Sequence, residues 1–198
     1  MKRDVVVIGS CGSNLASLGF ALKRLGVDAP VTEDPERVRR ATHVILPGVG
    51  AAAPGMTRLS AAGLAEVVPS LTQPVLGICL GMQLLFERSE ENDAEGLGLL
   101  EGRVRKLRAE PRWPHMGWNT LAPRAMPHRL LDGIGDGDWF YFVHGYAAPP
   151  GAATLAETHH GDAFAAVVAR ENVHGVQFHP EKSAAAGRRL LANFFALA

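Results

Sequence analysis

The chain has 198 residues, with 20 Lys or Arg and 20 Asp or Glu, so its formal net charge is zero. That balance argues against nucleic acid or an anionic membrane as a partner, and no apolar run approaches the roughly 20 residues of a membrane-spanning helix. The length suits a single globular domain over residues 1–198. The two cysteines, Cys11 and Cys79, predict neither a disulfide framework nor a zinc site, which favours a reducing cytoplasm.

Apolar runs and helical patterns alternate through the first half of the chain. Residues 5–8 form too short a stretch for a signal peptide and predict a strand buried on both faces. Asp34 followed by Pro35 predicts the start of a helix. An earlier helix that stops at Gly26 is indicated by leucines at three- and four-residue steps, namely Leu15, Leu18, Leu22 and Leu25.

Two more strands are expected at residues 43–46 and 75–78, and helices at about residues 59–68 and 82–88. Strands that alternate with helices predict parallel pairing, with the helices covering the sheet. The first half of the sequence therefore indicates an α/β fold.

The second half has a different pattern. Residues 96–164 are rich in Gly and Pro and contain short β-prone pieces, so we expect mainly antiparallel strands and loops added to the sheet, residues 139–143 being the clearest strand. A late strand at residues 173–178 and an amphipathic helix at 184–197 follow. The acidic residues 87–95 are interpreted as a solvated loop without a function.

The segment Gly77-Ile78-Cys79-Leu80-Gly81 joins a buried strand directly to a helix. This is the nucleophile-elbow pattern with Cys in place of Ser, in which small neighbours are needed because the turn is tight. Free N–H groups at the start of a helix favour a thiolate. A lone cysteine is more often a buried structural residue, but the paired glycines favour a nucleophile. Cys11 lacks this frame and is interpreted as a packed or loop thiol.

A thiol nucleophile needs a base that later returns its proton, and imidazole suits this role near neutral pH. His179 is the best placed of eight histidines, because it follows a predicted strand in Gln177-Phe178-His179-Pro180-Glu181 and ligands bind at the carboxyl edge of a parallel sheet. Glu181 can orient the ring. His159 and His160 are expected in a solvated polar loop, and His43 is expected to be structural.

Backbone N–H groups must also stabilise the oxyanion that forms when an amide is attacked. The N–H of Leu80 is one candidate. The second should come from a loop at the same edge of the sheet, and Leu46-Pro47-Gly48-Val49-Gly50-Ala51 fits, since two glycines after a strand allow the backbone to approach a ligand closely. Taken alone, this loop is more simply a strand-to-helix turn.

These segments together resemble the class I glutamine amidotransferases, in order and spacing over nearly the whole chain. Within that class, the chain is similar to the glutaminase subunits of imidazole glycerol phosphate synthases. This finer resemblance rests on Pro47-Gly48-Val49-Gly50, Pro114-His115-Met116-Gly117-Trp118-Asn119, Tyr141-Phe142-Val143-His144 and Glu181-Lys182-Ser183.

The resemblance implies a flavodoxin-like three-layer α/β fold with a mixed, mainly parallel sheet and helices on both faces. It implies a Cys79, His179 and Glu181 triad that hydrolyses glutamine through a glutamyl thioester, with the Val49–Gly50 peptide reorienting to complete the oxyanion hole. The resemblance also assigns glutamine binding to Gly50 and Gln83, and to Gly145 and Tyr146 at the amino-acid end.

The implied partner is a (β/α)8-barrel cyclase in a heterodimer, and no cofactor or metal is expected. Ammonia would pass through the barrel to a phosphoribulosyl-formimino aminoimidazole carboxamide ribonucleotide. The products would be imidazole glycerol phosphate and aminoimidazole carboxamide ribonucleotide, in histidine biosynthesis. By the same resemblance, the partner face would include Asn14, Trp118, Tyr141 and Lys182; on residue chemistry alone the two aromatic residues are equally core or surface residues.

Three positions depart from the family pattern. Gly145 stands where a hydroxyl residue is usual, which leaves a backbone contact to the substrate there. Ala52 replaces a common aromatic residue, and residues 9–14 lack the usual Asp.

Two alternatives remain. One is a glutaminase that supplies ammonia to another acceptor, such as chorismate, or that belongs to a paralogous pair in sugar amination. The Pro-Gly-Pro-Gly loop expected of the chorismate type is missing. The other is a binding module without activity, against which the presence of Cys79, His179 and Glu181 argues.

Overall fold

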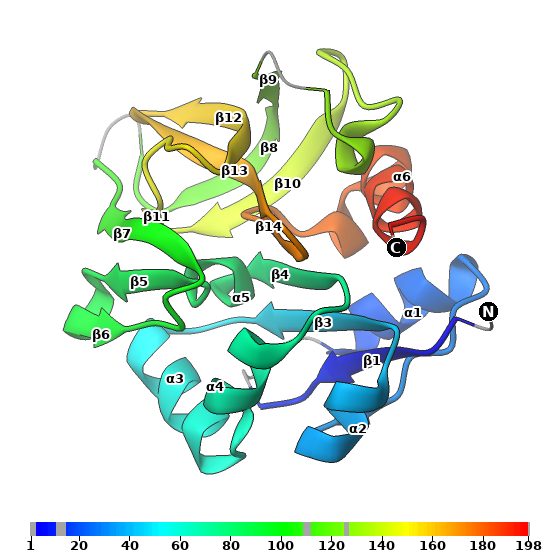
Figure 1. The fold of residues 1–198 in the computed structure, drawn as a ribbon. Helices are drawn as coiled ribbons and strands as arrows, with labels where there is room; N and C mark the ends of the chain where they lie inside the picture. The colour runs from blue at the N-terminus through cyan, green and yellow to red at the C-terminus, as the bar shows by residue number, and fades with distance from the viewer. Residues whose placement is uncertain (1–2, 11–14, 109–111, 125–126, 198) are drawn as a thin grey trace.

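The computed structural model describes residues 3–10, 15–108, 112–124 and 127–197. In this part of the chain, an eight-stranded sheet has the order β2-β1-β3-β4-β14-β13-β12-β9 (Figure 1). Neighbours in its first part pair in parallel: β2 (Val31–Thr32), β1 (Val5–Ile8), β3 (His43–Gly48), β4 (Val75–Cys79) and β14 (Val173–Val176). The other three strands pair antiparallel: β13 (Asp162–Arg170), β12 (Thr154–His160) and β9 (Ala122–Pro123).

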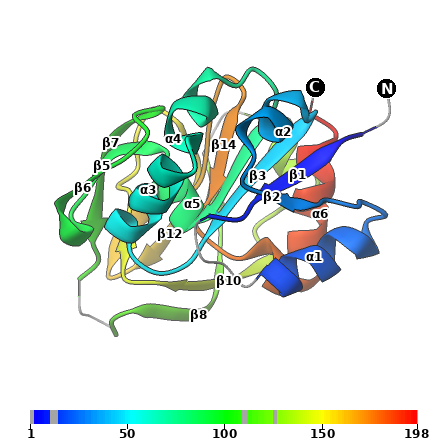
Figure 2. The same ribbon diagram turned by 90° about the horizontal axis from the view of Figure 1, so that it is seen from below.

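Helices cover both faces of the parallel strands (Figure 2). Val5 and Val7 of β1 belong to one buried cluster, and Val6 and Ile8 belong to another, as the two-residue period of a strand requires. The first cluster includes residues of α1 (Leu15–Arg24) and α6 (Ala184–Phe195); the second includes residues of α2 (Pro35–Arg40), α3 (Ala52–Ala61) and α4 (Leu64–Val67). The predicted three-layer α/β fold is confirmed.

The remaining strands form two smaller sheets beside the main one. β10 (Trp139–His144) pairs antiparallel with β8 (His115–Thr120). The other sheet has the order β11-β7-β5-β6, formed by β11 (Tyr146–Ala147), β7 (Leu100–Lys106), β5 (Phe86–Ser89) and β6 (Ala94–Glu95). The short helices are α5 (Leu80–Gln83), η1 (Val68–Ser70), η2 (Glu91–Asp93), η3 (Arg129–Leu131) and η4 (Pro180–Lys182). Residues 96–164 are therefore largely antiparallel, as predicted, but only part of them joins the main sheet.

The helices predicted before Gly26 and after Asp34 are both present. Leu18 and Leu22 are buried on α1, and Gly26 follows that helix with a φ of 71°. The Asp34 side chain accepts a hydrogen bond from the N–H of Glu36 at 2.9 Å and caps α2, with Pro35 at its first position.

Two predicted helices were wrong in extent. The helix expected at 82–88 ends at Gln83, because Phe86 begins a strand that pairs in parallel with β7. The apolar residues before Phe86 are buried, but they pack against several elements rather than along one face of a single helix. The helix expected at about 59–68 is divided at Gly63, whose φ is 68°, into α3 and α4.

Two predicted loops were also wrong. The acidic residues 87–95 form β5, η2 and β6 rather than a loop, although most of them are exposed to solvent, as predicted. His159 and His160 are the last residues of β12, and the ring of His160 stacks on that of His115 with 4.1 Å between the centroids. Backbone pairing with other strands gives both segments their extended structure.

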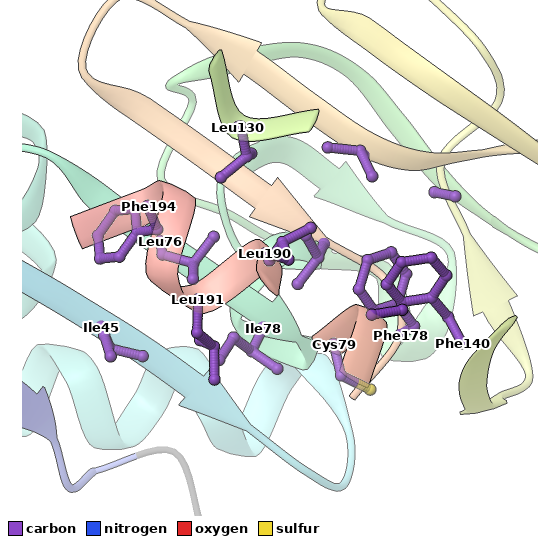
Figure 3. Close-up of a cluster of buried hydrophobic side chains, with 14 of the residues drawn as sticks. Ile45, Leu76, Ile78, Cys79, Leu130, Phe140, Phe178, Leu190, Leu191 and Phe194 are labelled. Atoms are coloured by element: carbon purple, nitrogen blue, oxygen red, sulfur yellow. The ribbon is translucent and has the colours of Figure 1, made fainter. Parts of the chain in front are cut away.

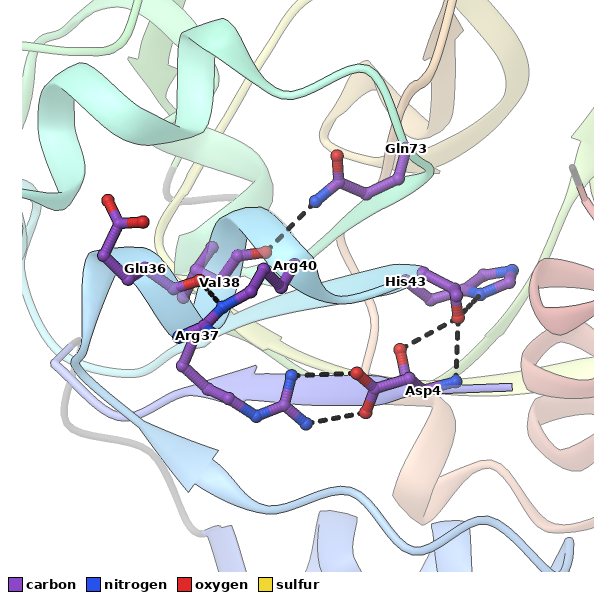
Figure 4. A network of polar contacts seen from close by, with 8 residues as sticks. Asp4, Glu36, Arg37, Val38, Arg40, His43 and Gln73 are labelled. Atoms are coloured by element: carbon purple, nitrogen blue, oxygen red, sulfur yellow. Dashed lines mark hydrogen bonds and ion pairs between the residues drawn. The ribbon is translucent and has the colours of Figure 1, made fainter. Parts of the chain in front are cut away.

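Polar contacts join the amino-terminal ends of β1 and β3 to α2 (Figure 4). Arg37 donates to both carboxylate oxygens of Asp4, at 2.6 and 3.0 Å, and the Thr42 hydroxyl donates to the Asp4 carbonyl at 2.9 Å. His43 Nε2 lies 3.1 Å from the Leu197 carbonyl, so its role is structural, as predicted. The opposite, carboxyl edge of these strands is left for the candidate site.

In the part of the chain that the structure describes, no helix combines the length and the apolar character needed to cross a membrane.

Candidate active site

Cys79 ends β4 and directly precedes α5, with φ of 53° and ψ of −110°. A non-glycine residue with positive φ is strained, and such strain is concentrated at functional turns. The turn also excludes side chains on both sides. A Cβ at Gly77 would lie 2.7 Å from the backbone nitrogen of Met82, and one at Gly81 would lie 1.7 Å from the carbonyl oxygen of Leu46. The predicted need for two glycines is therefore steric.

Cys79 belongs to the buried hydrophobic cluster, where it lies between Ile78 and Phe178 (Figure 3). Only 7% of the residue is exposed. The sulfur contacts two polar groups: the Val143 carbonyl at 3.9 Å and Gln177 Nε2 at 3.8 Å. Because α5 is a single turn, we expect the N–H groups of that turn, rather than a long helix dipole, to favour a thiolate.

His179 and Glu181 form a buried pair just after β14. Nδ1 of His179 lies 2.9 Å from Oε1 of Glu181, and the two side chains are 6% and 7% exposed. Burial lowers the pKa of His179, but the neighbouring Cys79 and Glu181 side chains outweigh it and raise that pKa to about 10. Nε2 has no hydrogen-bond partner among the described residues, and it belongs to the ring that lines one cavity together with Cys79. A pKa raised in this way favours the protonated ring at neutral pH.

A cavity of about 320 Å³ opens beside the thiol. That volume is at the small end for ligand sites and suits an amino acid. Its lining brings together every residue that the sequence assigned to the oxyanion hole or to glutamine: Val49, Gly50, Leu80, Gln83, Gly145 and Tyr146 line it with Cys79 and His179. Gly50 has a φ of 95°, in the left-handed region that glycine adopts freely.

The family model for glutamine amidotransferase class-I matches residues 7–198. The chain belongs to this family.

Within this family, the sequence is similar to that of particular synthase subunits. The chain is 52% identical to imidazole glycerol phosphate synthase subunit HisH of Xanthomonas axonopodis pv. citri (strain 306), over 96% of each chain. It is 49% identical to subunit HisH 2 of Legionella pneumophila (strain Paris), over 98% of each chain. Solved structures resemble it in fold: a glutamine amidotransferase has a TM-score of 0.75 at 23% identity over 97% of each chain, and PurLQS from Thermotoga maritima has 0.75 at 18% identity over 99% of each chain.

In this class I amidotransferase, a steric contact that the sequence did not reveal explains why position 145 is glycine. A Cβ at this position would lie 2.6 Å from Cζ2 of Trp113. The indole Nε1 of Trp113 donates to the Gly145 carbonyl at 3.0 Å, and the Leu107 N–H donates to the same oxygen at 2.9 Å. That carbonyl is therefore engaged, which leaves the N–H groups of this segment as possible substrate contacts.

Glu91 lines the same cavity and was missed, because it lies in the acidic stretch interpreted as a loop. Its Oε2 accepts a hydrogen bond from the Ala52 N–H at 2.9 Å. Burial raises the pKa of Glu91, and the bond from Ala52 opposes that rise. No sequence motif marks this residue; only the docking of η2 against α3 brings it to the site.

His144 also lines the cavity of the amidotransferase and is neutral. Burial and the neighbouring His115 lower its pKa to about 3. Its Nδ1 lies 2.9 Å from the Tyr146 carbonyl and its Nε2 lies 3.3 Å from Nδ1 of His115. Since a carbonyl only accepts, Nδ1 carries the proton, and Nε2 accepts from His115.

Next to this site, β8 and β10 carry an exposed aromatic face. Trp118 is 50% exposed, its ring meets that of Tyr141 edge-on at 5.9 Å, and Lys182 Nζ lies 5.6 Å from the Tyr141 ring centroid. The backbone N–H of His179 donates to the Tyr141 carbonyl at 2.9 Å, so β10 runs beside the candidate site. The remaining predicted interface residue, Asn14, lies outside the described residues, as does Cys11.

Proposed function

We propose that this amidotransferase is the glutaminase subunit of an imidazole glycerol phosphate synthase, which supplies ammonia for histidine biosynthesis. The observation that carries the proposal is the buried His179–Glu181 pair beside Cys79, in a chain about half identical to HisH subunits over nearly its full length. An amino-acid-sized cavity next to the thiol supports glutamine as the substrate.

The proposed chemistry uses the thiolate form of Cys79 as the nucleophile and the protonated form of His179, which the raised pKa of that ring favours. The sulfur attacks the side-chain carbonyl carbon of glutamine, and the oxyanion that forms accepts hydrogen bonds from the Leu80 N–H and the Val49–Gly50 peptide. When the carbon–nitrogen bond breaks, His179 gives its proton to the leaving ammonia. The neutral ring then takes a proton from water, which attacks the glutamyl thioester and releases glutamate, and the thiolate is restored.

Glu91 and Gln83 are proposed to hold the α-ammonium group of glutamine. The Gln83 amide nitrogen donates to the Tyr146 carbonyl at 2.8 Å and to Gln177 Oε1 at 3.0 Å, which leaves its own oxygen for the cavity. Among the described residues that line the cavity, none is Lys or Arg. The substrate carboxylate is therefore assigned to the N–H groups of Gly145 and Tyr146.

The partner is proposed to be the (β/α)8-barrel cyclase subunit, bound over the exposed face formed by Trp118, Tyr141 and Lys182. The HisH relatives are subunits by name, which supports an assembly. Ammonia would leave Cys79 towards this face, because the face adjoins the site through the His179–Tyr141 hydrogen bond.

Glutamine turnover by the purified chain tests the proposal, alone and with the cyclase and its nucleotide ligand. We expect slow hydrolysis alone, a strong increase with the loaded partner, and no activity after Cys79→Ala. Cys11→Ala is the matched control and is expected to remain active. A chain that neither binds the cyclase nor responds to it, or that remains active without Cys79, would contradict the proposal.

A further inference from the structure

Gln177 is the buried polar residue closest to the thiol that the chemistry above does not use. It follows β14, two positions before His179, and none of its surface is exposed. A buried amide without partners is costly, but both ends of this one are engaged. Its Nε2 lies 3.8 Å from the Cys79 sulfur, and its Oε1 accepts from Gln83 Nε2 at 3.0 Å.

A backbone carbonyl determines the direction of these hydrogen bonds. The Tyr146 oxygen can only accept, so the nearby amide group of Gln83 must be its nitrogen, at 2.8 Å. The second hydrogen on that nitrogen then points to Gln177 Oε1, which leaves the Gln177 nitrogen facing the sulfur. The Gln83 oxygen is left facing the cavity.

The sulfur thus lies between two groups, one of which favours the thiol and the other the thiolate. The Val143 carbonyl at 3.9 Å can accept a hydrogen bond from the thiol, and its oxygen repels a thiolate. The Gln177 N–H can donate a hydrogen bond to a thiolate, and this hydrogen bond becomes stronger when the sulfur is charged. Gln177 therefore favours the reactive form, and it joins the sulfur to the amide that meets the substrate.

We propose that Gln177 is a positioning residue that orients the Gln83 oxygen towards glutamine and donates a hydrogen bond to the Cys79 thiolate. This inference rests on the proposed role of Cys79 as nucleophile. Contact between glutamine and the Gln83 oxygen polarises the Gln83 N–H groups, and the effect passes through Gln177 to the sulfur. Glutamine recognition and thiolate formation are linked through two side-chain amides.

The rate at which iodoacetamide alkylates Cys79 of the full-length chain, followed against pH without glutamine, tests the inference. All chains carry Cys11→Ala so that only one thiol reports. For Gln177→Met, which has neither donor nor acceptor, we expect alkylation at pH 7 to fall at least about fivefold and its pH profile to move upward, since the thiolate is the reactive form. The other titratable groups near the sulfur, Glu91, His144, His179 and Glu181, remain in place.

Gln177→Glu serves as the second variant, because it keeps the shape and an oxygen to accept from Gln83. When ionised it cannot donate to the sulfur, so we expect the same upward shift and a lower kcat, with KM for glutamine changed less than in Gln177→Met. Gln73→Met is the matched control. Gln73 donates to the Val38 carbonyl at 3.1 Å, at the opposite edge of the sheet (Figure 4), and its loss should leave alkylation and turnover unchanged.

Unchanged alkylation profiles in both Gln177 variants would overturn the inference, even if their melting temperatures fall, because a purely structural amide affects stability alone. Failure of the proposed function would be separate from this result. It would appear as absent glutamine turnover in the parent chain with its partner, which the alkylation measurement does not require.

Discussion

At the scale of single residues, the neighbours of His179 control its pKa and therefore its protonation state. Its pKa is raised to about 10, so the ring is charged at pH 7 and loses its proton as pH rises through that value. Glu181 contributes to the rise through its bond to Nδ1, at 2.9 Å. Protonated imidazole is the form that can give a proton to leaving ammonia.

Glu181→Gln should therefore lower the pKa of His179 and move the alkaline limb of the kcat/KM profile to lower pH. At neutral pH we expect it to cost less activity than His179→Ala, for which a loss of roughly a thousandfold is expected because the proton donor is removed. Steady-state glutamine turnover between pH 6 and 10.5 would measure both. An alkaline limb at the same pH in Glu181→Gln would contradict the orienting role.

Glu91 offers a second residue-scale prediction. Removing its charge in Glu91→Gln should raise KM for glutamine with a smaller effect on kcat, because the α-ammonium group is remote from the reacting carbon. A rise of about tenfold corresponds to about 1.4 kcal/mol of binding energy. Initial rates at varied glutamine give both constants, with Glu87→Gln, in the same acidic stretch but outside the cavity lining, as the control.

The contact between Gly145 and Trp113 explains how this chain tolerates its departure from the family pattern. Gly145→Ser should raise KM, because the new Cβ displaces the indole and breaks its hydrogen bond to the Gly145 carbonyl. Overpacking of this kind costs about 1–3 kcal/mol. Trp113→Ala combined with Gly145→Ser should recover part of the loss; equal KM values in the single and double variants would contradict this explanation.

At the scale of elements, the site depends on how closely α5 packs against β3. Gly81→Ala places a Cβ 1.7 Å from the Leu46 carbonyl, a backbone atom that cannot move without disturbing the sheet. We expect a loss of at least about 3 kcal/mol in the free energy of unfolding, and loss of glutaminase activity. Denaturant titration measures the first.

Gly19→Ala is the control for this change. Gly19 lies inside α1, and its added Cβ would meet nothing within 4 Å. Alanine there should raise stability by about 0.5–1 kcal/mol. Equal effects of the two substitutions would show that the packing of α5 on β3 is not the cause.

At the scale of the whole molecule, the exposed aromatic face lies beside the edge of the sheet that carries the candidate site. Trp118→Ala should weaken binding of the cyclase by about 2 kcal/mol, roughly thirtyfold in Kd, since exposed tryptophans often dominate interfaces. Titration calorimetry with the purified cyclase measures the affinity. Arg40→Ala, at the opposite edge of the sheet, should bind normally; equal losses in both would contradict the assignment of this face.

Several features of the protein were determined by local sequence alone. The leucine stripe of α1 and the Asp34 cap of α2 follow from short segments, and so does the need for a small residue at Gly77, which faces the backbone of Gly81 and Met82. Parallel pairing then carries the ends of β3, β4 and β14 to one edge of the sheet. The approach of residues 49–50, 79 and 179 could therefore be predicted, while the extent of the single domain over residues 1–198 stays a prediction.

Only the tertiary structure decided which other side chains reach that edge. Glu91 enters through the docking of η2 on α3, Trp113 through its contact with Gly145, and Gln177 through an amide pair with Gln83. The prediction of a helix at 82–88 was wrong for the same reason, since Phe86 pairs with β7 instead of extending α5. Contacts between segments distant in sequence depend on the packing of whole elements, and no local pattern of residues encodes them.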